Sequence, residues 1–135
     1  MIKWDNKYSV NVSMIDDGHK KLIDVVNEAT FLQKYDDSPR AISEILVEMT
    51  AYALEHFKTE ETHMINFKYY DYKSHKDEHN NFSNKISNYC NKLMDGENKI
   101  KILDKIIEDL KQWLNNHIQE TDKKFVACFK ENGLK

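Results

Sequence analysis

Five of the six histidines in this chain stand at positions whose spacing could gather them around a metal. His75 and His79 are four residues apart, so on a helix they share one face about one turn from each other. His56 and Glu60 have the same spacing, and Glu60 falls on an apolar stripe, where an anion needs a cation beside it. The five histidines, which all fall on apolar stripes, are His19, His56, His75, His79 and His117.

A further candidate ligand, Asp122, lies five residues after His117. On an ideal α-helix this spacing would turn the two side chains about 140° apart. The apolar pattern runs in steps of three and four from Leu103 to His117 and resumes at Asp122, with one residue extra between them. We therefore predict a π-bulge between residues 117 and 122, a feature that often marks functional sites. In the alternative interpretation, Ile118 continues the regular pattern and Asp122 is solvated.

Together these residues make seven candidate ligands, which are too many for one metal ion and suit two. Imidazole combined with carboxylate favours iron, zinc, copper or manganese over calcium or magnesium. Glu61 is expected to point away from this group into solvent. His63, seven residues after His56, is expected to be a rim histidine partly in water.

Four helical stretches must position these residues. The first is expected from Ser13 to Tyr35, with Ser13 as its cap and Asp16 completing a capping box. The second begins at Ser38-Pro39, a cap residue followed by proline at the first helical position. The third begins near residue 71 and ends before Gly96, and the fourth runs from near residue 98 towards residue 133. Short connections predict antiparallel neighbours, hence an all-α, antiparallel up-down four-helix bundle.

Composition supports this fold and excludes several classes of protein. Three glycines and one proline in 135 residues disfavour an all-β or loop-rich chain. The length suits a single domain, residues 1–135. Within it, residues 1–12 are expected to form an extended N-terminal arm and residues 13–135 the bundle. The net charge of -3 does not suggest nucleic-acid binding. No apolar run approaches the roughly 20 residues of a membrane span, and the N-terminus has no signal-peptide pattern. Cys90 and Cys128 are expected to be buried free thiols, so we expect a cytoplasmic protein.

The candidate ligands and their surroundings resemble the hemerythrin family, in its bacterial branch. The motifs HxxxE, HxxxH and HxxxxD occur in this order after an earlier histidine, which is a highly specific set. Two positions depart from the family pattern: Tyr70 stands where proline is frequent, and Gly18 where a polar residue is more usual. The likeness covers nearly the whole chain and is carried by Trp4, residues 15–22, residues 56–61, Met64, Tyr69, His75, His79 and residues 113–122.

The resemblance implies a di-iron site bridged by an oxo or hydroxo group and by Glu60 and Asp122. It assigns one iron to His75, His79 and His117, and the other to His19 and His56. The iron with two histidines then has an open position, where O2 would bind end-on. The pocket around that position should be apolar, and the expected lining residues are Ile118, Leu114, Leu22 and Met64.

The function that follows is reversible O2 binding, as a carrier, store or sensor, and not catalysis. Two alternatives stay open. One is a di-iron enzyme such as a peroxidase or a nitric-oxide scavenger, which would use the same open position for peroxide or NO. The other is a dizinc or dimanganese site with a hydrolytic or structural role, since the ligand types overlap. Mixed charged and polar outward faces favour a monomer, without a membrane or nucleic-acid partner.

Overall fold

The computed structural model describes residues 2–35 and 38–134, which contain helices and turns and no strand. The first helix is α1 (Ser13–Tyr35), preceded by a short turn, η1 (Asn6–Tyr8). The second rod is built from α2 (Pro39–Tyr52), η2 (Ala53–Phe57) and α3 (Lys58–Asn66), and the third is α4 (Tyr72–Met94). The fourth rod is built from α5 (Lys99–Gln112), η3 (Trp113–Thr121), η4 (Asp122–Phe125) and α6 (Val126–Glu131).

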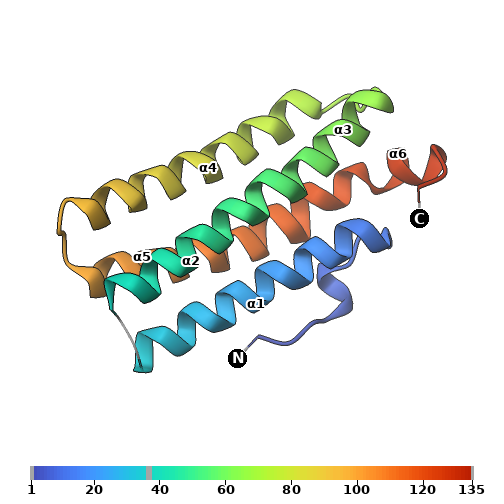
Figure 1. The fold of residues 1–135 in the computed structure, drawn as a ribbon. Helices are drawn as coiled ribbons and strands as arrows, with labels where there is room; N and C mark the ends of the chain where they lie inside the picture. Colours follow the sequence, from blue (N-terminus) through green and yellow to red (C-terminus); the bar gives the residue numbers. More distant parts are fainter. Residues whose placement is uncertain (1, 36–37, 135) are drawn as a thin grey trace.

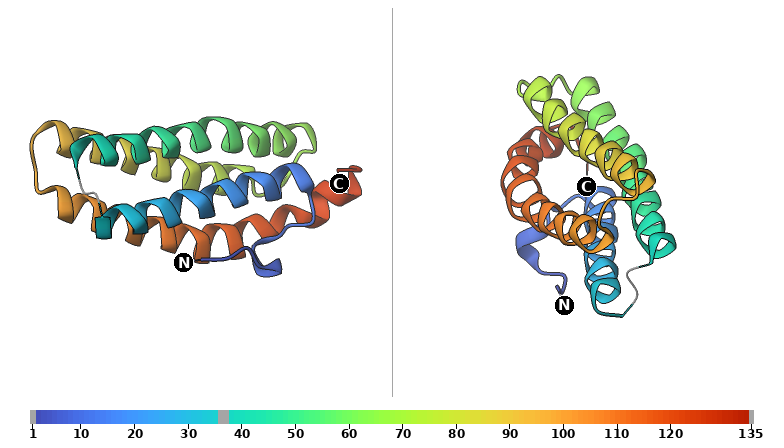
Figure 2. Two further views of the ribbon diagram at one scale, coloured as in Figure 1. Left: turned by 60° about the horizontal axis from the view of Figure 1, so that its bottom comes forward. Right: turned by 90° about the vertical axis from the view of Figure 1, so that its left-hand side faces the viewer.

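The four rods form an antiparallel bundle, as predicted. Helix α1 packs against α2 and α5, and α4 packs against the same two helices from the other side (Figure 1). The end-on view in Figure 2 shows the rods surrounding a common centre. The beginnings of α1 and α4 therefore lie at the same end of the bundle as α3, η3 and α6. All seven candidate ligands belong to this end.

Most helix ends follow the predicted signals. The Ser38 side chain accepts a hydrogen bond from the Ala41 amide, and Pro39 opens α2. Gly96 lies just beyond α4 with a φ of 75°, a left-handed conformation that glycine adopts without steric cost. The predicted capping box at Ser13 is wrong. The Asp16 carboxylate instead accepts hydrogen bonds from the Val10 amide and the Ser9 hydroxyl, and so ties the arm to α1.

The N-terminal arm is part of the packed structure. It was expected to be extended, but it contains the helical turn η1, which lies against η3. The Ile2 amide and carbonyl both bond to the Asn27 side chain, which fastens the start of the arm to α1. Tyr8 is buried, and its carbonyl points towards the candidate ligand His19. The arm therefore contributes to the site as well as to the core.

The apolar core is divided into two clusters. The larger one fills the bundle between the four rods and includes Leu22, Leu114 and Ile118. The smaller one lies under the arm and the C-terminal turn and includes Ile15, Met64, Tyr69, Phe125 and Phe129. Full burial of such a side chain contributes about 1.5–3 kcal/mol.

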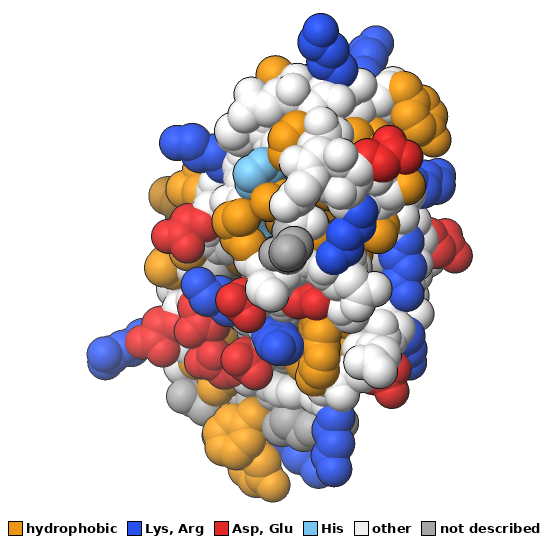
Figure 3. Space-filling view, turned by 90° about the vertical axis from the view of Figure 1, so that its right-hand side faces the viewer, with side chains coloured by type: hydrophobic (Ala, Val, Ile, Leu, Met, Phe, Trp, Pro, Cys, Tyr) orange, Lys and Arg blue, Asp and Glu red, His pale blue; other side chains and the backbone are white. Residues whose placement is uncertain are grey.

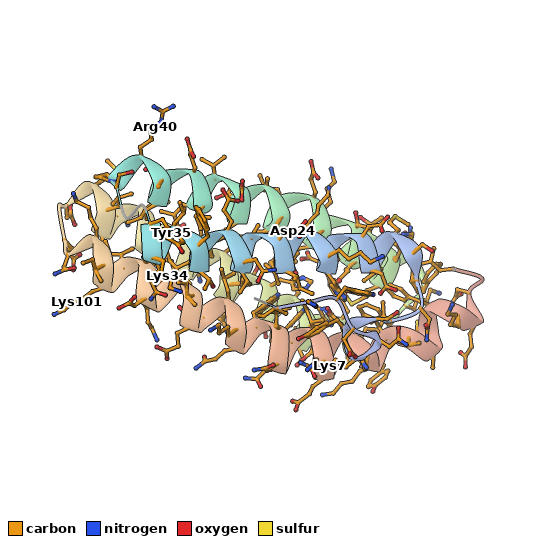
Figure 4. All side chains as sticks on the ribbon, turned by 90° about the horizontal axis from the view of Figure 1, so that it is seen from below. Lys7, Asp24, Lys34, Tyr35, Arg40 and Lys101 are labelled. Carbon is orange, nitrogen blue, oxygen red and sulfur yellow. The ribbon has the colours of Figure 1, made fainter. Side chains whose placement is uncertain are left out.

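The polar face of each rod points outward. Arg40 and Lys101 project from the bundle in Figure 4. None of the helices among the described residues is long and apolar enough to cross a bilayer. Cys90 and Cys128, expected to be buried, are free but only half-buried, because both lie at the edge of the apolar clusters.

Candidate metal centre

Two π-helical segments position three of the candidate ligands. The predicted irregularity between residues 117 and 122 is confirmed: η3 is π-helical, and Asp122 begins a 3-10 turn directly after it. The widened turn lets the neighbours His117 and Ile118 both face inward and also brings Asp122 inward. A second π-helical segment, η2, was not predicted. It buries His56 together with its neighbour Phe57, whose ring stacks on His79.

Glu60 lies between two groups of histidines. Its Oε2 atom is 2.6 Å from Nε2 of His56 and 3.8 Å from Nε2 of His19. Its Oε1 atom is 3.2 Å from Nε2 of both His75 and His79. The carboxylate therefore presents one oxygen to each group.

Asp122 has the same arrangement from the opposite side. Its Oδ2 atom is 2.9 Å from Nε2 of His19, and its Oδ1 atom is 2.9 Å from Nε2 of His117 and 3.0 Å from Nε2 of His75. These residues offer two sets of potential metal-binding atoms. Within each set, all the atoms lie within 4.8 Å of one another. We call them the three-His subsite (Glu60, His75, His79, His117, Asp122) and the two-His subsite (His19, His56, Glu60, Asp122). The two carboxylates belong to both.

Three of the histidines are held by partners on their outer side. The Nδ1–H of His19 donates to the Tyr8 carbonyl, at 2.9 Å. The Nδ1–H groups of His79 and His117 donate to Glu61 and Glu78, also at 2.9 Å. Such bonds fix the ring orientation and turn Nε2 towards the centre, as is usual for histidines that bind metals.

Two of these outer partners correct or extend the sequence interpretation. Glu61 was expected to be solvated, but it accepts hydrogen bonds from His79 and from Lys76. Glu78 was not singled out, and it also accepts a hydrogen bond from the Thr121 hydroxyl. The signal that could have found them is general: each buried metal-binding histidine needs an acceptor for its second nitrogen.

The charges at the centre are strongly coupled. Burial acts to lower the pKa of His19 and His75, but hydrogen bonds to Asp122 and Glu60 outweigh burial and raise each pKa to about 10. Burial acts in the opposite direction on Glu60, yet the nearby imidazoles hold its pKa well below its usual value. Two buried carboxylates thus demand positive charge beside them.

The buried atoms at the centre fit metal ions better than they fit one another. Nε2 of His79 and Nε2 of His117 are 3.2 Å apart. With each Nδ1–H donating outward, a neutral His79 and a neutral His117 would face each other with two acceptor nitrogens. Nε2 of His56, Oε2 of Glu60 and Oδ1 of Asp122 are also buried without a properly aligned hydrogen bond among the described residues. A cation between them would satisfy these atoms, so the donor set fits the metals that the resemblance implies.

Comparison with known proteins bears on this arrangement. A model of the hemerythrin HHE cation binding domain matches residues 10–129. The chain belongs to the hemerythrin family. Its curated relatives include a bacteriohemerythrin of Clostridium acetobutylicum, 29% identical over 129 residues, which cover 93% of this chain and 99% of the relative. A bacteriohemerythrin of Pseudomonas aeruginosa is 30% identical over 129 residues, covering 96% of this chain and 82% of the relative.

Solved hemerythrin structures have the same fold. The crystal structure of a hemerythrin with a leucine-to-tyrosine substitution superposes with a TM-score of 0.82 and is 27% identical. The alignment covers 95% of this chain and 96% of that one. A second hemerythrin, with a leucine-to-alanine substitution, gives a TM-score of 0.75 at 28% identity over the same shares of the two chains.

The four residues expected to line the hemerythrin pocket are all buried. Leu22, Leu114 and Ile118 belong to the larger apolar cluster. Met64 belongs to the smaller cluster. The assignment of these four residues to the pocket remains a proposal.

Two further aromatic residues lie near the hemerythrin site. Trp113 stacks on His117 with ring centroids 3.7 Å apart and donates a hydrogen bond to the Tyr52 hydroxyl. His63 belongs to neither subsite. It is half-buried against the rings of Phe67 and Phe129. In Figure 3, a small area of histidine surface shows among apolar side chains on the face that is turned to the viewer.

Proposed function

We propose that this chain binds O2 reversibly at a di-iron centre, as an oxygen carrier, store or sensor. The observation that supports this most directly is the shared position of Glu60 and Asp122. Each carboxylate presents oxygen to both the two-His and the three-His subsite. Binding of O2 at an open position requires two metals that share carboxylate ligands. One metal must also have fewer histidine ligands than the other. When bound, the two irons supply that position and the electrons for O2.

The protein's own residues orient and protect this centre. The bonds from His19, His79 and His117 to their outer partners hold three imidazoles with Nε2 inward. Leu22, Leu114 and Ile118 present hydrocarbon that excludes water and carries no proton donor. A pocket without an acidic side chain offers no general acid catalysis, which favours binding over turnover. We also infer that residues 1–135 act as one domain, because the arm supplies the Tyr8 carbonyl.

The proposal is tested by optical spectroscopy. Protein purified in air should show the bands of an oxo-bridged diferric centre, which bleach on reduction. Admission of O2 to the reduced protein should then produce a distinct spectrum that disappears when O2 is removed. A colourless protein that contains zinc by elemental analysis would contradict the proposal.

Ile118 offers a direct test of the pocket. We expect Ile118→Glu to shorten the lifetime of the oxygenated form and to raise peroxidase turnover, because it places a proton donor beside the open position. General acid catalysis typically contributes about 10²–10⁴-fold to a rate. The matched control is Ile118→Leu, which keeps the site apolar. Stopped-flow spectra that show equal lifetimes for wild type and Ile118→Glu would contradict the pocket assignment.

A further inference from the structure

Gly18 lies against the candidate ligand His56. A Cβ atom at position 18 would be 1.8 Å from Nδ1 and 2.4 Å from Cε1 of the His56 ring. No non-bonded atoms approach so closely, so His56 occupies this place only because residue 18 has no side chain. The helices α1 and η2 therefore meet at a glycine directly behind the two-His subsite.

A surface groove opens at the same place. It has a volume of about 400 Å³ and lies between the first turns of α1 and the η2 region. Gly18 and His56 form part of its wall, with Asp17, Lys21, Glu55 and Thr59 around them. The groove thus borders the His56 ring, which is buried but, with 7% of its surface exposed, is the most exposed of the five candidate histidine ligands.

His56 also differs from the other histidines in how it is held. His19, His79 and His117 each donate Nδ1–H to an oxygen of the protein. Nδ1 of His56 has no such partner among the described residues and faces the groove. The His75 Nδ1 atom has none either, but it is fully buried. On its outer side the His56 ring is held only by packing, between Gly18 and the stacked ring of Tyr52, although its Nε2 atom faces Glu60.

We propose that the two-His subsite is the exchangeable metal position of the pair, opened to solvent by Gly18. A ring without an outer hydrogen bond can swing into the groove and release its metal. At the three-His subsite a smaller pocket, of about 190 Å³, reaches His117, but Glu78 holds that ring and Glu61 holds the ring of His79. Loss of an outer partner typically weakens metal binding by about 10- to 100-fold. This inference rests on the proposed function only in requiring that two metals bind.

The test is metal release from the ferrous protein. The chain is loaded anaerobically with two iron(II) ions and mixed with an excess of a chromogenic chelator. We expect two phases of equal amplitude, with the first about tenfold faster or more. Release of both irons in one phase would overturn the inference while leaving the proposed function intact. Failure to bind a second iron would instead count against the proposed function.

Variants assign the phases. Gly18→Ala should displace His56, so the protein should retain about one iron per chain, released at the slow wild-type rate. The control Asp24→Ala, on the exposed face of α1, should leave both phases unchanged. Two irons with wild-type phases in Gly18→Ala would overturn the inference.

If circular dichroism shows that Gly18→Ala does not fold into helices, a second variant still tests the inference. Glu61→Gln weakens the outer partner of His79 and should accelerate only the slow phase. Acceleration of the fast phase alone would show that the assignment is reversed and would overturn the inference.

Discussion

Glu60→Gln is expected to bind at most one metal ion per chain and to lose the spectrum of the oxygenated protein. The substitution keeps the shape of the side chain but removes the charge that faces both subsites. Because outer partners of metal ligands alone contribute about 10- to 100-fold to affinity, loss of a shared carboxylate should cost more than about 100-fold. Elemental analysis after loading with iron(II) measures the effect.

The neighbouring residue provides the matched control. Glu61→Gln removes the same charge one position along α3, but Glu61 contacts only the outer nitrogen of His79. It should retain two metals at wild-type loading concentrations. Both metal-free variants should remain helical by circular dichroism, since neither substitution opens a cavity. Equal metal contents in Glu60→Gln and wild type would show that Glu60 is not a shared ligand.

Metal loading should produce the largest change in stability. Without metal, two buried carboxylates and several imidazole nitrogens depend on one another for charge and hydrogen bonds. A ligand that binds only the folded state stabilises it by about 4 kcal/mol at a thousandfold excess over its Kd. For a chain of this size that corresponds to a rise in Tm of about 10–20 °C. Calorimetry of chelator-stripped and iron-loaded protein measures it.

Glu60→Gln also serves as a control for the stability experiment. Its Tm should hardly respond to iron, because the binding that drives stabilisation is lost. If wild type and Glu60→Gln gained the same stability, the iron would be acting elsewhere on the chain. If wild type gained none, the cluster would be a histidine–carboxylate network that holds no metal.

The helices and the candidate ligands could be predicted from the sequence because both produce periodic patterns in it. Ser38-Pro39 and Gly96 mark helix ends through local backbone chemistry, and the structure confirms them. The extra residue between His117 and Asp122 disturbs the apolar period, which revealed η3. The other π-helical segment, η2, left no such trace. Its apolar positions are spaced like those of a regular helix, and only the burial of Phe57 next to His56 reveals it.

The contacts between rods could not be predicted from the sequence. Asp16 was interpreted as a capping residue because sequence spacing shows the helix but not the arm that folds back onto it. Glu61 and Glu78 acquire their roles only when α3, α4 and η3 come together. Gly18 departs from the family pattern, but the sequence alone does not show what the glycine permits. Its close approach to His56 depends on how α1 packs against η2.

Oxygen uptake by the reduced, iron-loaded protein tests the proposed di-iron centre most directly. Iron and O2 are measured in the same sample, first under air and then under argon. A centre in which Glu60 and Asp122 hold two irons with one open position should take up one O2 for every two irons and return it under argon. Uptake of one O2 per iron, or consumption of O2 without its return, would contradict the proposal.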